Sequence, residues 1–315
     1  MKLTFLIRRF AWVLFVIVGA TFIAFLITKM APGDPARVIL GVQANPEDVA
    51  ALREKLGLNR PFLVQYFSWL WNMLGGDFGE SLVRGNPIGP MLLRRLSRSL
   101  QLGVAGLFVG TIIAFPLGII SALKRGSKLD LVATVFSQIG ISMPKFWLAT
   151  LLVILFSISL DWLPALGYSG LGEGLGKWFA HLVLPAITMG VGSAAIQTRF
   201  IRSAVLEVLS KDYVRTARSK GLRESRVIFL HALRNAMISI VTIIGLQMAS
   251  MISIAVVVEI VFAWPGLGRL ALQAVLDRDY TLLRSSIAVI AAIVALINLS
   301  VDCLYFFLDP RIEFE

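Results

Sequence analysis

The chain has 315 residues, of which 57% are hydrophobic and 16% are charged, and its net charge is +11. Such an apolar composition does not suit an ordinary soluble domain, so it predicts an integral membrane protein. Lys and Arg are scattered over segments that flank apolar runs and form no nucleic-acid-reading motif, so we expect no nucleic-acid partner. Cys303 is the single cysteine, which excludes a disulfide within the chain.

Six windows are long and apolar enough to cross a membrane, since a spanning helix needs about 20 such residues. They run from Phe10 to Met30, Leu100 to Leu123, Leu131 to Leu160, Leu182 to Ile201, Ala236 to Val258 and Ser285 to Leu308. The first window follows Arg8 and Arg9, as the apolar region of a signal peptide follows basic residues. This window is too long for a signal peptide and no small-residue cleavage site follows it, so we expect an uncleaved span. Pro144 gives the long third window a reason to kink.

The distribution of Lys and Arg orients the spans, because cytoplasmic loops carry an excess of positive charge. Placing the N-terminus inside puts the most basic loops in the cytoplasm. We therefore expect an all-α polytopic membrane protein with six transmembrane helices, both termini cytoplasmic, and a single domain over residues 1–315. Residues 31–98 become an extracytoplasmic insertion, and residues 202–235 become a cytoplasmic loop. Arg94, Arg95 and Arg98 fit the charge rule poorly, but a long loop weakens that rule.

Short helices are expected on the outer side between the spans. Asn45 and the residues after it have the pattern of a helix start, and Gly57 would end that helix. The segment Phe62 to Leu74 is rich in aromatic residues, which suits the lipid headgroup level, although a small folded cap over the bundle is the alternative. A further helix from Arg269 to Leu276 is expected after the turn-forming residues 263–268.

Catalytic and metal-binding motifs are missing from the chain. His181 and His231 fall on opposite sides of the membrane, so they predict no metal site. The glycine-rich segment Gly170 to Lys177 resembles a phosphate-binding loop but lacks the required hydroxyl residue after the lysine, where Trp178 stands. We interpret it as a flexible outer loop, and we expect no cofactor bound by this chain.

Polar side chains within the apolar windows are candidates for a transport pathway. Ser239, Thr242, Ser250 and Ser253 share one helix face of the fifth window, with Leu246 between them and Gln247 beside it. Such a stripe can line a wet pathway, or it can serve close helix packing. In the last window, Asn298 and Asp302 stand four residues apart and share a face. Asp302 can anchor the inner end of the span by snorkelling or by pairing with a basic neighbour, and a role in conduction is the alternative. We expect close packing, not a pathway, at the small residues Gly190 to Ala195.

The segment Lys211 to Leu222 is basic and stands between two apolar runs. Leu206, Val208, Leu209, Tyr213 and Ala217 alternate with charges, as in a short amphipathic helix, and Gly221 is placed as its C-terminal stop. Binding to lipid headgroups or a role in topology would explain such a helix. Docking into a groove on a soluble partner is the third explanation.

At these residues the chain resembles a known family. Tyr213 to Leu222 (YVRTARSKGL), followed by His231 to Ala236 (HALRNA), is similar to the coupling loop of inner-membrane permeases of binding-protein-dependent ABC importers, in the dipeptide, oligopeptide and nickel branch. Further motifs match in order: residues 31–35 (APGDP), 76–81 (GDFGES), 142–144 (SMP), 262–269 (FAWPGLGR) and 309–312 (DPRI). Arg215, Thr216 and Ala217 stand where the wider importer family has Glu-Ala-Ala, a departure that this branch shares.

This resemblance implies a division of labour. Two cytoplasmic ATPase subunits would bind ATP and Mg, this chain and a second homologous permease subunit would form the passage, and an extracytoplasmic substrate-binding protein would deliver the substrate. The chain itself would be no enzyme but a multi-pass inner-membrane subunit in contact with membrane lipid. The residues implied in ATPase coupling are Lys211, Asp212, Tyr213, Arg215, Thr216, Ala217, Arg218, Lys220 and Gly221. Tyr213 and Ala217 are expected in the groove, and Arg215, Arg218 and Lys220 at its rim.

Two other interpretations stay open from sequence. A secondary transporter with its own ion-coupled site would also be helical, but no inverted repeat is evident. A membrane-embedded enzyme would need clustered ionisable residues inside the lipid. Within the importer family, short peptides are the default substrate, and a nickel chelate or an opine is the alternative.

Overall fold

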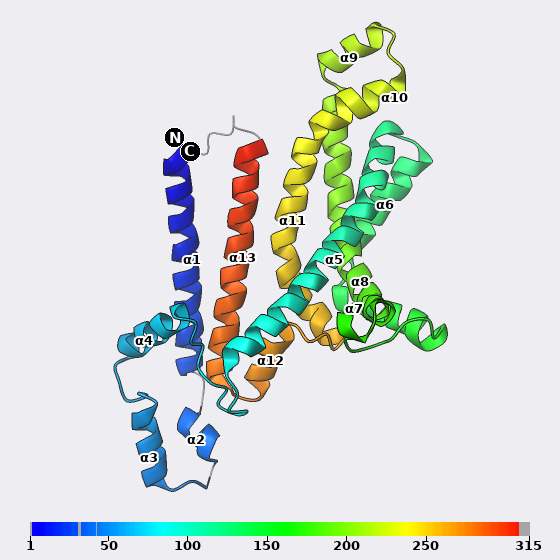
Figure 1. Cartoon of the computed structure of the whole chain (residues 1–315). Helices are drawn as coiled ribbons and strands as arrows, with labels where there is room; N and C mark the ends of the chain where they lie inside the picture. The colour runs from blue at the N-terminus through cyan, green and yellow to red at the C-terminus, as the bar shows by residue number, and fades with distance from the viewer. Residues whose placement is uncertain (1, 31–32, 42, 309–315) are drawn as a thin grey trace. The chain divides into compact units, whose positions relative to one another are not determined.

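The computed structural model describes residues 2–30, 33–41 and 43–308, and every regular element in these ranges is a helix (Figure 1). The motif at residues 309–312 and the first two residues of the motif at 31–35 lie outside them. The α-helices are α1 (Lys2–Met30), α2 (Pro35–Leu40), α3 (Pro46–Lys55), α4 (Phe62–Leu74), α5 (Ile88–Leu123), α6 (Lys128–Ser142), α7 (Lys145–Leu152), α8 (Leu175–Leu209), α9 (Asp212–Ser219), α10 (Glu224–Arg226), α11 (Arg234–Val261), α12 (Leu267–Leu276) and α13 (Tyr280–Leu308). Two π-helical segments, η1 (Val153–Ser159) and η3 (Val227–Leu233), and a short 3₁₀ helix, η2 (Leu171–Glu173), complete the set.

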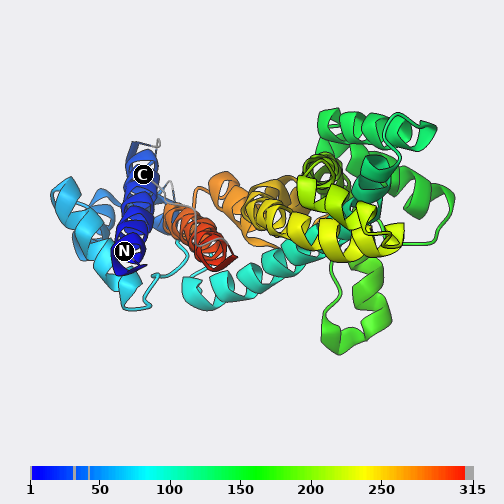
Figure 2. The same cartoon turned by 90° about the horizontal axis from the view of Figure 1, so that it is seen from above.

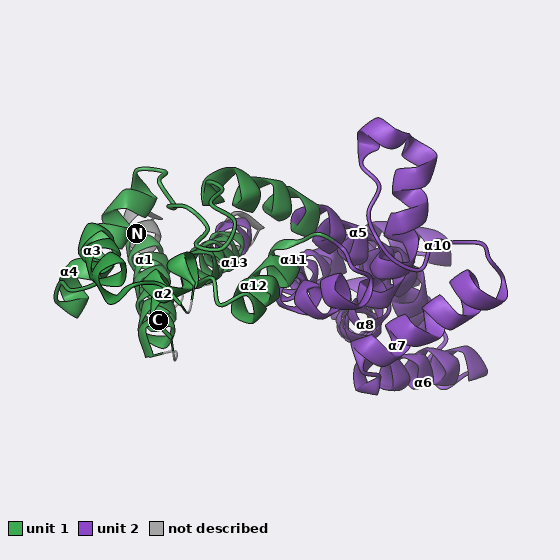
Figure 3. Ribbon diagram, turned by 90° about the horizontal axis from the view of Figure 1, so that it is seen from below, with its two compact units in different colours: residues 1–99, 265–299 green, residues 100–264, 300–315 purple. Residues whose placement is uncertain are grey.

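The chain folds into two compact units (Figure 3). Unit 1 holds the residues up to Ser99 together with Pro265–Leu299, and unit 2 holds Leu100–Trp264 together with the end of the chain from Ser300. Each unit is therefore assembled from segments that are distant in sequence. The single domain expected over residues 1–315 stays a prediction.

The predicted membrane helices are present, with longer bounds than expected. In the described part of the chain, five helices are long and apolar enough to cross a membrane, or six if one sharply bent pair counts as a single span. Helix α5 begins twelve residues before Leu100, and α8 extends past both ends of the window from Leu182 to Ile201. Arg94, Arg95 and Arg98, expected in a loop, lie within α5. Arginine and leucine both favour helix, so the helix extends beyond the apolar window that hydropathy identifies.

The bent pair is the expected third span, and the break falls at Pro144. Helix α6 ends at Ser142, α7 begins at Lys145, and the two are bent by 106°. Proline disfavours a helical conformation in the residue before it, here Met143, which is extended. At the break Lys145 Nζ donates a hydrogen bond to the Gly140 carbonyl oxygen at 3.5 Å. It also fills the space that a side chain at Gly192 of α8 would need.

In unit 1, α4 packs one of its faces against α1 and α13. Phe25, Tyr66, Trp69 and Ala288 form the buried cluster. The Tyr66 hydroxyl lies 3.2 Å from the Val18 carbonyl oxygen and 3.0 Å from the Thr21 hydroxyl, so a polar contact fixes the packing. The helices expected at Phe62 to Leu74 and after residue 268 are both confirmed.

A second cluster in unit 1 holds α12 against the first turns of α5 and α13. Ile88 and Leu92 of α5 contact Leu267 and Leu270 of α12 and Leu282 of α13. The backbone N–H of Leu267 donates to the Ser99 hydroxyl oxygen at 2.8 Å. This bond satisfies one of the free amides at the start of α12.

Unit 2 is built on close contact between α5 and α8, with α6 and α11 packed on α8 (Figures 1 and 2). Glycines allow the approach: a Cβ atom at Gly110 of α5 would lie 2.9 Å from Ser193 Cβ, and one at Gly190 of α8 would lie 2.7 Å from Val109 Cγ1. Gly140 of α6 meets Ala195 of α8 in the same way. The close packing predicted for residues 190–195 is thereby confirmed.

A leucine at Gly110 would enter this interface and separate the two helices. Gly110→Leu should destabilise the protein by about 1–3 kcal/mol through overpacking, measured as a lower midpoint of thermal unfolding in detergent. Gly19→Leu is the matched control, because no atom lies within 4 Å of a Cβ built at Gly19 of α1. Equal midpoints for the two variants would contradict the packing described here.

Candidate functional site

The basic segment singled out in the sequence forms α9, an eight-residue helix at the tip of unit 2 (Figure 1). Asp212 in its first turn and Arg218 in its last turn have the charges that complement a helix dipole. Gly221 has φ of +76°, and its N–H donates to the Arg218 carbonyl oxygen at 2.9 Å. Glycine adopts this left-handed conformation without strain, so the predicted stop at Gly221 is confirmed.

The underside of α9 is packed within unit 2. Val214 is fully buried, Ala217 is 7% exposed, and both contact Val227 of η3. Val208 and Leu209 at the end of α8 pack against the same cluster. The helix is therefore seated on the end of α8 and the start of the helix that leads into α11. The predicted amphipathic helix is correspondingly shorter, because Leu206 to Leu209 belong to α8.

Ala217 was expected to contact a groove on another protein, and the structure places it elsewhere. Residues 214 and 217 lie three apart, on one face of a helix, and that face is occupied by Val227. Ala217 contributes to the seat of α9, and its side chain is not on the accessible face.

The outer face of α9 is polar and exposed. It carries Lys211, Asp212, Tyr213, Arg215, Thr216, Arg218 and Lys220. The Tyr213 side chain is 44% exposed, and its hydroxyl accepts a hydrogen bond from Asn235 Nδ2 at 3.1 Å, which orients the ring. Arg218 is engaged within the chain, since its guanidinium lies 2.7 Å from the Glu224 carboxylate. Arg218 therefore braces the turn after α9. Tyr213, Arg215 and Lys220 are exposed on the same face, where Arg215 lies 3.7 Å from the Asp212 carboxylate.

A buried ion pair lies at the same end of α8. Arg202 of α8 donates to both carboxylate oxygens of Asp130 in α6, at 2.7 and 2.9 Å. The Ser121 hydroxyl of α5 donates to the same carboxylate at 2.6 Å, and the N–H of Gly126 donates at 2.9 Å. The Asp130 side chain is only 9% exposed. One carboxylate therefore joins α5, α6 and α8 below the seat of α9.

A second polar link joins α5 and α8 deeper in unit 2. The Thr111 hydroxyl donates to Gln197 Oε1 at 3.0 Å, and Gln197 Nε2 donates to the Ser193 hydroxyl oxygen at 2.8 Å. Sequence reasoning missed this link and the ion pair. Serine three residues before an acid is a typical helix start, and the Ser127 hydroxyl accepts from the Asp130 N–H, but this local pattern does not indicate Arg202 as the partner.

The predicted pathway residues of α11 separate into two groups. Ser239, Ser250 and Ser253 are exposed together with Leu246, and Thr242 is half-buried, so these residues form one accessible stripe. Gln247 does not belong to it. A rotation of about 100° from Leu246 carries it to the packed side of the helix, where it is 6% exposed. Asn298 is exposed on α13.

The ion pair generates a stability prediction. Asp130→Asn should destabilise the protein by about 1–3 kcal/mol, because the amide leaves the Arg202 charge without its partner. Thermal unfolding in detergent measures the effect. Glu207→Gln is the matched control: it removes the exposed pair with Lys211, whose atoms lie 3.1 Å apart, and should leave the midpoint unchanged. A midpoint for Asp130→Asn equal to that of the control would show that the pair does not hold the helices.

Comparison with known proteins places this arrangement in a family. Residues 114–314 match the family model described as "Binding-protein-dependent transport system inner membrane component", and residues 2–89 match the model of the corresponding N-terminal part. The oligopeptide transport system permease protein AppB of Bacillus subtilis is 40% identical over 98% of this chain and 99% of its own length. The dipeptide transport system permease protein DppB of Escherichia coli K12 is 37% identical over 99% of both chains.

The fold is also similar to solved structures. A chain of the MetNI methionine ABC transporter, in an inward-facing conformation, aligns with a TM-score of 0.58 over 70% of this chain and 96% of its own, at 19% identity. A chain of an amino acid ABC transporter aligns with a TM-score of 0.52 at 18% identity. These likenesses concern the fold. From the family models and the full-length relatives, the protein is a multi-pass inner-membrane permease subunit, and it belongs to the inner membrane components of binding-protein-dependent ABC importers.

Proposed function

We propose that this permease takes up short peptides, as one of two homologous but different permease subunits. Two cytoplasmic ATPase subunits would bind ATP and Mg and supply the energy, and an extracytoplasmic binding protein would deliver the peptide. Relatives named as oligopeptide and dipeptide permeases support the substrate class, since they match nearly the full length of the chain. A nickel chelate or an opine remains the alternative substrate. The observation that carries the coupling proposal is the exposed polar face of α9 on a packed seat.

The ATPase would grip α9 through Tyr213, Arg215 and Lys220. Because the underside of α9 is packed against the end of α8 and the start of η3, a displacement of α9 would be transmitted to both helices. The Asp130 ion pair would carry the same displacement from α8 to α5 and α6. Alternation between inward-facing and outward-facing states by such element shifts is an established form of conformational switching.

The proposed orientation places α9 and both termini in the cytoplasm and residues 31–98 outside. It follows from the positive charge of the segment around α9. The accessible stripe of Ser239, Ser250 and Ser253, with Thr242 beside it, would then line the pathway, and Asn298 is a further candidate. Hydroxyl groups suit varied peptides, because they can donate or accept hydrogen bonds to peptide backbones of any sequence.

Gly221 tests the coupling proposal. Valine is strained at φ of +76°, so Gly221→Val should displace the end of α9. We expect normal membrane levels but loss of peptide uptake, while the ATPase of the reconstituted importer no longer responds to loaded binding protein. Gly172→Val is the matched control, since Gly172 has open space around it and its φ is not positive. Unaltered uptake by Gly221→Val would refute the proposal.

Cysteine crosslinking tests which residues face the ATPase. In a Cys303→Ser background, Arg215→Cys should crosslink to an ATPase subunit because Arg215 is exposed, whereas Val214→Cys should not because Val214 is fully buried. The crosslinked pair is identified by mass and by antibody. Equal crosslinking at both positions, or none at Arg215, would contradict the docking face.

A further inference from the structure

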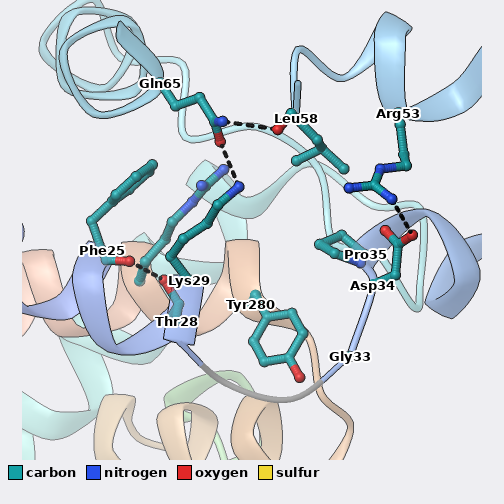
Figure 4. Close-up of a pocket in the computed structure, with 11 residues that line it drawn as sticks. Phe25, Thr28, Lys29, Gly33, Asp34, Pro35, Arg53, Leu58, Gln65 and Tyr280 are labelled. Atoms are coloured by element: carbon teal, nitrogen blue, oxygen red, sulfur yellow. Dashed lines mark hydrogen bonds and ion pairs between the residues drawn. The ribbon is translucent and has the colours of Figure 1, made fainter. Parts of the chain in front are cut away.

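A cavity of about 260 Å³ in unit 1 has no role in the coupling mechanism (Figure 4). It lies where α1 ends and α13 begins, and α2, α3 and α4 also contribute lining residues. Its lining residues are Phe25, Thr28, Lys29, Gly33, Asp34, Pro35, Arg53, Leu58, Gln65, Tyr280 and Arg284. All of them belong to unit 1. In the orientation proposed above, this is the extracytoplasmic end of the unit.

The lining carries an excess of positive charge. Lys29, Arg53 and Arg284 are its cations, and Asp34 is its one carboxylate. That carboxylate is already engaged, because it lies 3.4 Å from Arg53. Lys29 has only a neutral partner among the described residues, Gln65, whose Oε1 accepts its hydrogen bond at 3.2 Å. Lys29 therefore has no acidic partner among the described residues, and Arg284 has Asp279 as an electrostatic neighbour but no carboxylate within ion-pairing distance.

Arg284 is the more constrained of the two. Its guanidinium carbon lies 5.3 Å from the Phe25 ring centroid and 5.5 Å from that of Trp69, so the aromatic faces hold the group in place. Its Nε atom is buried without a hydrogen-bond partner, and no carboxylate in the described ranges is within ion-pairing distance. A buried Nε–H without an acceptor is costly, and a carboxylate is the group that matches the planar donors of a guanidinium.

A second cavity, of about 210 Å³, adjoins the first. It shares Leu58, Gln65 and Arg284 with the first cavity. Arg284 therefore lines both spaces, and a carboxylate that enters either one meets the same guanidinium.

The surface of α4 argues against a lipid headgroup as the occupant. Leu63, Phe67 and Trp71 form the exposed apolar face of α4, with Trp71 77% exposed. Gln65, which lines the cavity, is about 200° from Leu63 around the helix. The face that suits lipid and the face that lines the cavity thus point in opposite directions, and the cavity is turned away from the lipid-facing side of α4.

The size of the cavity argues against a whole peptide. Pockets that enclose a drug-sized ligand measure roughly 300–1,000 Å³, so this cavity suits a single side chain or a terminal group. In an importer of this family, the soluble partner on the outer side is the binding protein. We propose that the cavity is a carboxylate socket that takes an Asp or Glu side chain of the loaded binding protein. This inference rests on the proposed function and orientation.

The test uses the complete importer in lipid nanodiscs, with ATP hydrolysis measured against the concentration of peptide-loaded binding protein. Arg284→Gln should raise the half-saturating concentration about tenfold, the effect of losing a charge-assisted hydrogen bond, with the maximal rate unchanged. Lys29→Gln should also raise the half-saturating concentration. Because Lys29 is exposed, this variant should fold normally even if Arg284→Gln does not. Arg37→Gln is the matched control: it removes an exposed cation of α2 that does not line the cavity.

Unchanged half-saturating concentrations in both Arg284→Gln and Lys29→Gln would overturn the inference. So would an equal rise in Arg37→Gln, which would indicate a diffuse charge effect. If these concentrations stay constant while Arg284→Gln loses discrimination between free-acid and amidated peptides in uptake, the socket belongs to the substrate and the proposal is wrong. Absence of stimulation by the binding protein in the unmodified importer would instead refute the proposed function itself.

Discussion

The bidentate pair between Asp130 and Arg202 is the constraint on which the α9 end of unit 2 depends. Asp130 also accepts hydrogen bonds from Ser121 and Gly126, so the carboxylate has four donors around it. A buried pair of this kind adds little stability over apolar packing, but loss of one partner leaves a buried charge. The three helices that it joins are thereby restricted to one arrangement, and α9 is seated on the end of one of them.

Glycine packing gives the same unit its rigidity deeper in the bundle. Gly106, Gly110 and Gly118 of α5 face side chains of α8 at distances where a methyl group would collide. Close contact between backbones leaves little room for one helix to shift alone. The proposed coupling needs this property, because a helix that deforms locally would absorb a displacement applied at α9 before it reached the proposed pathway.

The sequence predicted the parts of this structure that depend on local chemistry. Hydropathy located the spans, Pro144 located the break, and Gly221 located the end of α9, because each acts on its own stretch of backbone. Contacts between distant segments could not be predicted. Asp130 and Arg202 are 72 residues apart, and no local sequence pattern around either residue indicates the other as its partner. The prediction for Ala217 was wrong for the same reason, since its burial depends on contact with Val227. Gln247 is buried because neighbouring helices cover that side of α11.

The break at Pro144 also makes two positions interdependent. The chain turns there so that the Lys145 ammonium occupies the space beside Gly192 that any other residue would claim for its own side chain. A larger residue at 192 requires the end of the lysine side chain to move away or to be shortened. The energetic effects of changes at these two contacting sites are therefore not expected to add. The segment that breaks at Pro144 and helix α8 thus contact each other through Lys145 and Gly192. The residue type at one of these positions restricts the residue types that fit at the other.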